Sequence, residues 1–135
     1  MKILNKENMN PNNSAPVVND ESKPYWEAAI NGKLLVKKCN TCGEVHHYPR
    51  TICPFCFSDN TTWTEASGRG AIYSYSVMRK ATVPYVMAYV TLEEGPTMMT
   101  NIVECDVDAL AIGQPVSVIF QDTGEGTALP MFTPA

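Results

Sequence analysis

The chain has 135 residues, of which 44% are hydrophobic and 18% charged, and its formal net charge is −4. This length suits one modest domain or two very small ones. No apolar run approaches the ~20 residues of a membrane-spanning helix, and residues 1–19 lack the apolar stretch of a signal peptide. We therefore expect a cytoplasmic protein without a membrane partner, in a compartment where paired cysteines favour metal sites over disulfides.

The first 33 residues predict a leader followed by a helix. Residues 1–19 are polar and rich in asparagine, which is typical of a flexible leader. A helix is expected over residues 20–33, because Asp20 or Ser22 can cap its start and Pro24 suits its first turn. So short a helix needs a partner surface, and its bulky apolar side chains are candidates for docking on another protein. These docking candidates are Tyr25, Trp26 and Ile30.

The next segment carries the strongest motif of the chain, two CxxC pairs separated by ten residues. Each pair can wrap a tight turn around one metal ion, and two pairs supply the four thiolates of a closed structural Zn²⁺ site. Short strands expected around them complete a zinc ribbon over residues 34–66. Iron also suits a tetrahedral sulfur cage, and a redox dithiol is the weaker alternative because one pair would suffice. The predicted metal ligands are Cys39, Cys42, Cys53 and Cys56.

Three other residues could take part in chemistry. His46 or His47 could replace a thiolate at the metal, although both can equally cover the surface of the ribbon. Cys105 could be a nucleophile, but its neighbours Glu104 and Asp106 would raise its pKa and suppress the thiolate. We expect an ordinary cysteine at the end of a strand.

The remaining residues, 67–135, predict a small barrel. A turn or bulge signal, Gly68-Arg69-Gly70, precedes short β-like runs at 71–78, 85–92, 97–104, 116–121 and 127–132. One helical turn capped by Asp106 is expected at 106–110. Four or five short strands joined by turns are typical of a Greek-key barrel.

Charge bears on the alternative that this barrel binds single-stranded nucleic acid. Tyrosines on a barrel face can stack on bases, and Tyr73, Tyr75, Tyr85 and Tyr89 are the candidates. All ten Lys and Arg residues lie in the first 80 residues, however, and the last 55 carry seven acids and no basic side chain. A groove that follows a phosphate backbone needs positive potential, so a protein interface is favoured.

Catalytic motifs are missing from the sequence. There is no glycine-rich phosphate loop, no HExxH zinc motif and no serine nucleophile motif. We therefore assign no catalytic residue and expect a non-catalytic subunit.

The order of the motifs resembles the zinc-ribbon/OB-fold proteins that accompany thiolase-like enzymes in acyl-CoA metabolism. The resemblance covers about residues 20–135. It rests on Pro24-Tyr25-Trp26-Glu27-Ala28-Ala29, Gly32-Lys33-Leu34, Cys39-Asn40-Thr41-Cys42-Gly43, Tyr48-Pro49-Arg50, Cys53-Pro54-Phe55-Cys56, Trp63, Ser67-Gly68-Arg69-Gly70, Tyr73-Ser74, Ile112-Gly113-Gln114-Pro115-Val116 and Leu129-Pro130-Met131-Phe132.

This resemblance implies a mainly β chain with an N-terminal helix, a rubredoxin-like zinc ribbon and a C-terminal OB-fold barrel. It implies a hetero-oligomer in which the chain supports a thiolase-fold catalytic subunit. That subunit would perform β-ketoacyl-CoA thiolysis, carbon–carbon cleavage or condensation, or acyl transfer. It further implies that acyl-CoA reaches the chain through the complex, with a coenzyme A thioester at the shared interface, in addition to the structural Zn²⁺.

Overall fold

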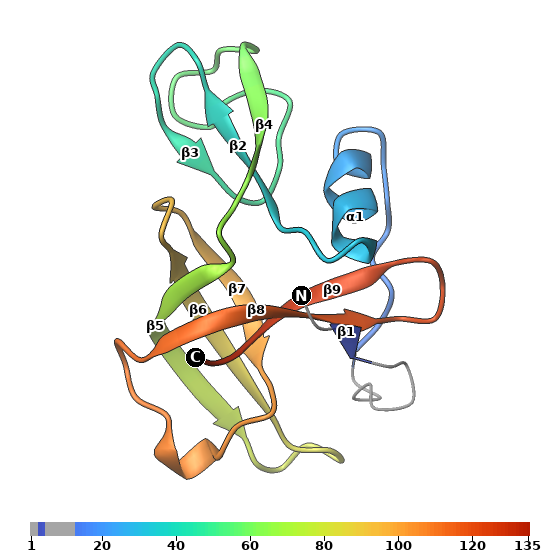
Figure 1. Ribbon diagram of the computed structural model, residues 1–135, viewed down its shortest axis with the longest axis vertical. Helices are drawn as coiled ribbons and strands as arrows, with labels where there is room; N and C mark the ends of the chain where they lie inside the picture. The colour runs from blue at the N-terminus through green and yellow to red at the C-terminus, as the bar shows by residue number, and fades with distance from the viewer. Residues whose placement is uncertain (1–2, 5–12) are drawn as a thin grey trace.

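The computed structural model describes residues 3–4 and 13–135, which form a mainly β chain with one α-helix, α1 (Figure 1). The upper part of the molecule in Figure 1 is a ribbon of three strands, and the lower part is a barrel. The helix lies beside both. The predicted fold class, a helix followed by a zinc ribbon and an OB-fold barrel, is confirmed.

Helix α1 spans Lys23–Ile30, shorter than the predicted 20–33. Pro24 stands in its first turn, and Gly32 follows its end with a left-handed φ of 77°, which glycine adopts without strain. Ser22 is the N-cap residue, but its side chain makes no capping hydrogen bond to the helix. No helix among the described residues has the length and apolar character of a membrane span.

The ribbon sheet has the order β3-β2-β4, with antiparallel pairs throughout. Strand β2 is Leu35–Cys39, β3 is Val45–His46 and β4 is Thr61–Glu65. The ribbon meets the barrel where the amide N–H of Ala66 donates to the carbonyl of Leu34, at 2.8 Å between N and O.

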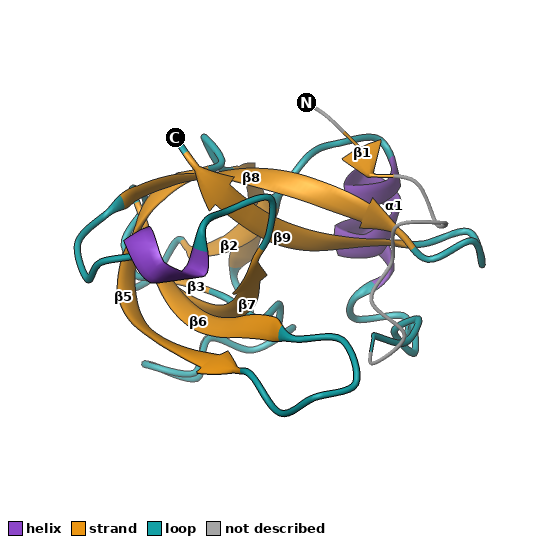
Figure 2. Cartoon of the chain, turned by 90° about the horizontal axis from the view of Figure 1, so that it is seen from below, coloured by secondary structure: helices purple, strands orange, loops and turns teal. Residues whose placement is uncertain are grey.

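The barrel is built from the five long strands β5–β9. These are β5 (Arg69–Met78), β6 (Tyr85–Leu92), β7 (Thr97–Ile102), β8 (Pro115–Asp122) and β9 (Ala128–Pro134). The sheet order is β1-β8-β5-β6-β7-β9, and β9 also pairs with β8 along its length, which closes the sheet on itself (Figure 2). A 3₁₀ turn, Val107–Ala109, lies between β7 and β8, and the Asp106 carboxylate accepts from the Asp108 amide as predicted.

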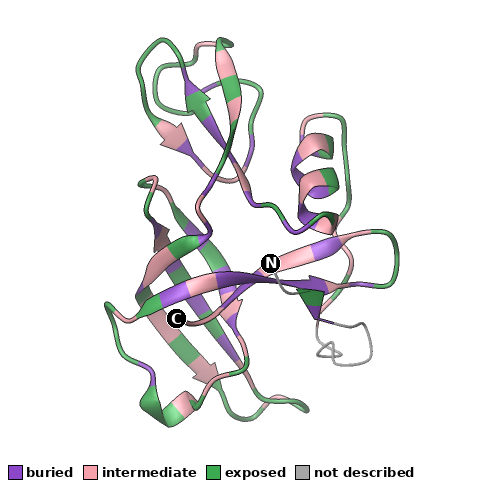
Figure 3. Cartoon of the chain, in the orientation of Figure 1, coloured by how far each residue is buried: buried purple, intermediate pink, exposed green. Residues whose placement is uncertain are grey.

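The core follows the alternation of the strands (Figure 3). On β6, Val86, Ala88 and Val90 point inward and are at most 1% exposed. The same apolar cluster continues through Tyr25, Trp26, Leu34 and Val36 into the helix and the ribbon. The ribbon, the helix and the barrel therefore share one hydrophobic core.

Two features depart from the sequence interpretation. Arg69 and Gly70 belong to β5 rather than to a turn, and the bulge falls between Ile72 and Ser74. The backbone approaches so closely here that a Cβ on Gly70 would lie 2.6 Å from the Thr91 carbonyl oxygen. Gly68 does turn the chain, with a φ of 80°.

Within the predicted leader, Ile3–Leu4 form a short strand, β1, that pairs in parallel with Phe120 and Gln121 of β8. Residues 1–2 and 5–12 of that leader lie outside the described residues. The flexibility of the leader stays a prediction.

Candidate metal centre and the surfaces around it

The four predicted metal ligands come together at the tip of the ribbon. The Sγ atoms of Cys39, Cys42, Cys53 and Cys56 all lie within 4.8 Å of one another. The Cys39–Cys56 sulfur pair is 3.6 Å apart and the Cys42–Cys53 pair 3.7 Å. A tetrahedral Zn²⁺ with ~2.3 Å bonds to sulfur separates its ligands by about 3.8 Å, so the cluster fits this ion.

Both cysteine pairs are held by the same backbone turn. The amide N–H of Gly43 donates to the Cys39 carbonyl, and that of Phe57 donates to the Cys53 carbonyl, each at 2.9 Å between N and O. Gly43 and Phe57 stand at equivalent places and both have left-handed φ values, 80° and 66°. The amide of Cys42 also donates to the Cys39 sulfur, which lowers the pKa of Cys39 to about 6 and favours its thiolate.

This arrangement is a closed structural site. Four thiolates complete the tetrahedral shell of Zn²⁺ and leave no position for water or substrate. Neither histidine joins the cluster: Nε2 of His46 accepts from the Arg50 amide, and Nε2 of His47 lies 2.8 Å from the Tyr25 hydroxyl. Cys105 is not among the four clustered cysteines, and burial raises the pKa of its thiol.

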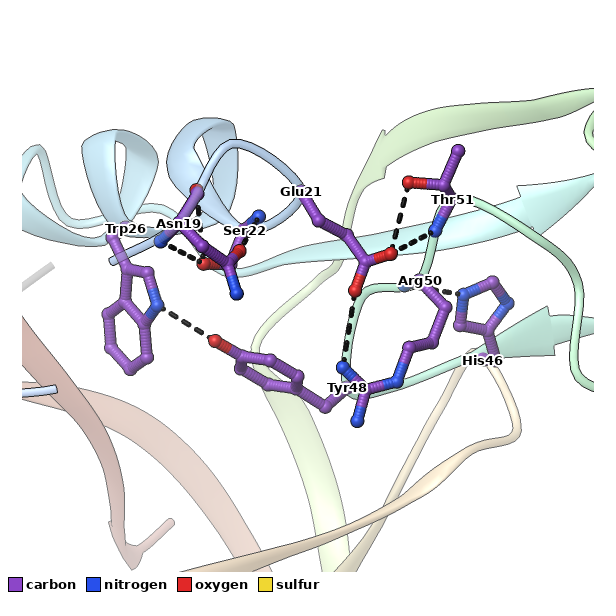
Figure 4. Close-up of polar contacts among 8 residues, drawn as sticks. All are labelled: Asn19, Glu21, Ser22, Trp26, His46, Tyr48, Arg50 and Thr51. Atoms are coloured by element: carbon purple, nitrogen blue, oxygen red, sulfur yellow. Dashed lines mark hydrogen bonds and ion pairs between the residues drawn. The ribbon is translucent and has the colours of Figure 1, made fainter. Parts of the chain in front are cut away.

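An aromatic and ionic junction joins the start of the helix to the segment that follows β3, residues 48–51 (Figure 4). The indole N–H of Trp26 donates to the Tyr48 hydroxyl at 2.9 Å between N and O. The Glu21 carboxylate accepts from the amide and the hydroxyl of Thr51, each at 3.0 Å, and from Arg50 at 3.2 Å. These bonds lower the pKa of Glu21 and fix the start of the helix against the ribbon.

The predicted docking residues contribute to this junction. Tyr25 is 2% exposed and Trp26 8%, because Tyr48, His47 and the barrel cover them. Ile30 is half-buried against the same core. Docking of these side chains on another protein stays a prediction, although the chain itself already covers two of the three.

An apolar groove of about 260 Å³ opens beside the junction. Its floor includes Trp26 and Tyr48, and its opposite wall comes from strands β6, β7 and β9. Four methionines line that wall: Met87, Met98, Met99 and Met131. Methionine side chains adapt to differently shaped apolar surfaces, which makes this wall suitable for contact with a partner.

The barrel surface gives little support to nucleic-acid binding. Tyr73 is 66% exposed and Tyr89 46%, but Tyr75 is half-buried and donates to the Leu110 carbonyl. The two arginines nearest these strands form ion pairs, Arg69 with Glu93 and Arg79 with Asp108. Paired cations offer no continuous positive track to a phosphate backbone.

Sequence reasoning missed the junction and the contact that holds Glu94 to the end of the ribbon. Glu21 and Thr51 are 30 residues apart, and Ser67 reaches Glu94 across 27 residues. No local motif marks such pairs. The adjacent histidines were the one local signal of the junction, because His46 bonds to Arg50 and His47 bonds to Tyr25 of the helix.

Comparison with known proteins agrees with this architecture. A profile for the rubredoxin-like zinc ribbon domain of ChsH2 matches residues 26–62. A profile for the C-terminal OB-fold domain of ChsH2 matches residues 63–121.

Several curated and solved proteins are similar over most of the chain. A DUF35 domain-containing scaffold protein of Methanothermobacter thermautotrophicus is 40% identical over 99 residues, covering 68% of this chain and 74% of the relative. A chain of the solved Ltp2-ChsH2(DUF35) aldolase is 34% identical with a TM-score of 0.77, covering 89% of this chain and 98% of that one.

A longer relative is a probable enoyl-CoA hydratase alpha subunit of Thermomonospora curvata. It is 34% identical over 125 residues, and the present chain spans 39% of its length. The two profiles, together with the scaffold protein and the aldolase chain, show that this chain belongs to the DUF35 family of zinc-ribbon and OB-fold proteins.

Proposed function

We propose that the chain is a scaffold subunit of a complex that processes acyl-CoA thioesters. The observation that carries this proposal is the similarity to the DUF35 chain of the Ltp2-ChsH2(DUF35) aldolase, which extends over 98% of that chain at 34% identity. The class of substrate in this proposal is supported by the hydratase alpha subunit, whose name refers to an enoyl-CoA.

The chemistry of the described residues favours a supporting role over a catalytic one. The four clustered thiolates form a closed site, and the Nε2 atoms of both histidines are engaged in hydrogen bonds inside the fold. The remaining thiol, Cys105, has a raised pKa and is weakly nucleophilic at neutral pH. A nucleophile and a general base are therefore to be supplied by the partner.

The finer proposal is that the partner has a thiolase fold and that the two chains form a cytoplasmic hetero-oligomer. The partner would cleave, condense or transfer acyl groups, and this chain would help shape the site for the coenzyme A thioester. The methionine-lined groove, in which Met87 and Met99 are exposed, offers a surface for that contact. Structural Zn²⁺ would keep the ribbon rigid while the partner docks.

Co-purification followed by assay tests the proposal. The tagged chain is expressed in its native cells, the complex is isolated, and the partner is identified by mass spectrometry. Partner alone, chain alone and the reconstituted pair are then assayed for cleavage and condensation of acyl-CoA. We expect a thiolase-fold partner and activity from the pair only. A partner that is fully active alone, or a chain that purifies alone, would contradict the proposal.

A further inference from the structure

A second cleft, of about 410 Å³, lies between the ribbon and the turn that joins β6 to β7. One wall is formed by His46 at the end of β3 and by Pro54 and Phe55 of the second cysteine turn. The other wall is formed by the turn residues Glu94 and Pro96. Phe55 is 59% exposed although it is a large apolar side chain.

On the ribbon wall, His46 offers a hydrogen-bond donor that is not used. The side chain is 4% exposed, and its Nε2 accepts the Arg50 amide N–H at 3.2 Å between the nitrogens (Figure 4). A neutral imidazole that accepts at Nε2 carries its proton on Nδ1. That Nδ1 atom is shielded from solvent and has no hydrogen-bond partner among the described residues.

On the opposite wall, Glu94 offers an acceptor that is not used. Its Oε2 accepts the Ser67 amide N–H at 2.9 Å, which fixes the carboxylate at the link between ribbon and barrel. Its Oε1 is shielded from solvent and, within residues 3–4 and 13–135, has no hydrogen-bond partner. Leaving a buried polar group unpaired is destabilising, so two such groups on the residues of one cleft indicate that a partner group belongs there.

The chemistry of that group follows from the two atoms. It has to accept from His46 and donate to Glu94, and these residues stand on opposite walls. A trans secondary amide carries an acceptor and a donor on opposite edges of one plane, so a single amide can serve both residues. A carboxylate would face Glu94 with like charge, and a primary amide would bury a second N–H without an acceptor.

We propose that this cleft binds one neutral secondary amide, with its carbonyl on Nδ1–H of His46 and its N–H on Oε1 of Glu94. The proline rings and Phe55 supply the apolar walls usual in such sites. Because both polar atoms lie below the surface, entry of the amide would require the ribbon and the turn to separate slightly. This inference does not depend on the proposed function, since it concerns atoms of this chain alone.

The test compares N-methylacetamide with N,N-dimethylacetamide, which keeps the carbonyl and lacks the N–H. Binding to the zinc-loaded full chain is followed through the His46 Nδ1–H signal in ¹⁵N NMR spectra. We expect saturable binding, about tenfold tighter for the probe with the N–H, which is about 1.4 kcal/mol for one hydrogen bond to a charged carboxylate. Equal affinities, or no saturable shift as in a cleft that holds only water, would overturn the proposal.

Glu94→Gln isolates the second contact. The glutamine oxygen can still accept from Ser67, which turns the NH₂ group into the cleft, so the preference for the N–H probe should disappear. Glu93→Gln makes the same change of charge one residue away, at a side chain held by Arg69, and should keep the preference. A preference that survives Glu94→Gln would also overturn the proposal.

A third probe distinguishes the source of the amide. Acetyl-trialanine N-methylamide presents several backbone amides in an extended segment. Tighter binding than N-methylacetamide would identify a polypeptide as the ligand, and equal binding would identify an isolated amide of a small molecule.

Discussion

His47 shows how the packing of the junction changes the chemistry of a single residue. Its ring packs beside Tyr25, at 5.4 Å between ring centroids, and its Nε2 shares a hydrogen bond with the Tyr25 hydroxyl. Burial disfavours the charged imidazolium, and the neighbouring His46 adds to this, which lowers the pKa of His47 to about 4. The folded chain therefore holds a neutral histidine well below pH 6.5.

This lowered pKa predicts a stability change at mildly acidic pH. The unfolded chain takes up a proton near pH 6.5 and the folded chain only near pH 4, so stability is full above pH 6.5 and falls as pH decreases between these values. Allowing for partial exposure of the ring, we expect a loss of about 2 kcal/mol across this window. Urea unfolding at a series of pH values measures it.

His47→Gln should flatten this part of the pH profile, whereas Tyr25→Phe, which keeps the titrating ring, should not. The Glu21 carboxylate, whose pKa is lowered, loses its contribution only at still lower pH, so the two effects separate. An unchanged slope in His47→Gln would contradict the assignment.

At the scale of elements, α1 depends on tertiary packing. It has no side-chain cap, no acidic residue in its first turn and no basic residue in its last turn. Eight residues without these features do not form a stable helix alone. Its stability comes from Tyr25, Trp26 and Ala29, all buried against the ribbon and the barrel.

Trp26→Ala should consequently destabilise the whole chain. The substitution empties a buried site and leaves the Tyr48 hydroxyl without its indole donor, so we expect a loss of about 3–5 kcal/mol in the free energy of unfolding. Glu27→Ala, on the exposed side of the same helix, is the control and should change stability by less than about 1 kcal/mol. Chemical denaturation of both variants makes the comparison. A small effect of Trp26→Ala would show that the helix docks weakly on its own chain.

The sequence could predict elements where a pattern is local. Strand β6 has the predicted bounds 85–92 because its residues are β-branched and aromatic and the turn Glu93-Glu94-Gly95-Pro96 follows it. Strand β1 was missed because two residues carry no periodicity, and its place depends on pairing with β8, over 100 residues away. The bulge at Ile72 likewise arises from pairing with β6 and leaves no mark in the residue types.

The whole molecule combines a part that carries the cysteine cluster with a part whose sheet closes through its own strand pairs. The ribbon has a short three-stranded sheet whose tip is held by four cysteines, and their spacing alone predicted the site. The barrel closes through its own strand pairs. The cleft between the two could not be predicted, because His46 and Glu94 line one cleft only when both parts are folded and packed together.

This division predicts that loss of zinc unfolds the ribbon and spares the barrel. Binding of Zn²⁺ by four thiolates supplies roughly 10–16 kcal/mol, which a ribbon without a core of its own cannot replace. Cys39→Ser and Cys56→Ser should lower the zinc content and expose the amides of residues 35–65 to rapid hydrogen exchange. The amides of strands β5–β9 should stay protected. The barrel should nevertheless unfold at a lower denaturant concentration, because Leu34 and Val36 leave the shared core.

Cys105→Ser is the matched control, since it removes a thiol outside the cluster and should change neither zinc content nor exchange of the ribbon. Unchanged zinc in both ribbon variants would refute the ligand set. Loss of protection throughout β5–β9 would show that the barrel cannot hold its fold without the metal, because the shared core would then contribute more to stability than closure of the sheet.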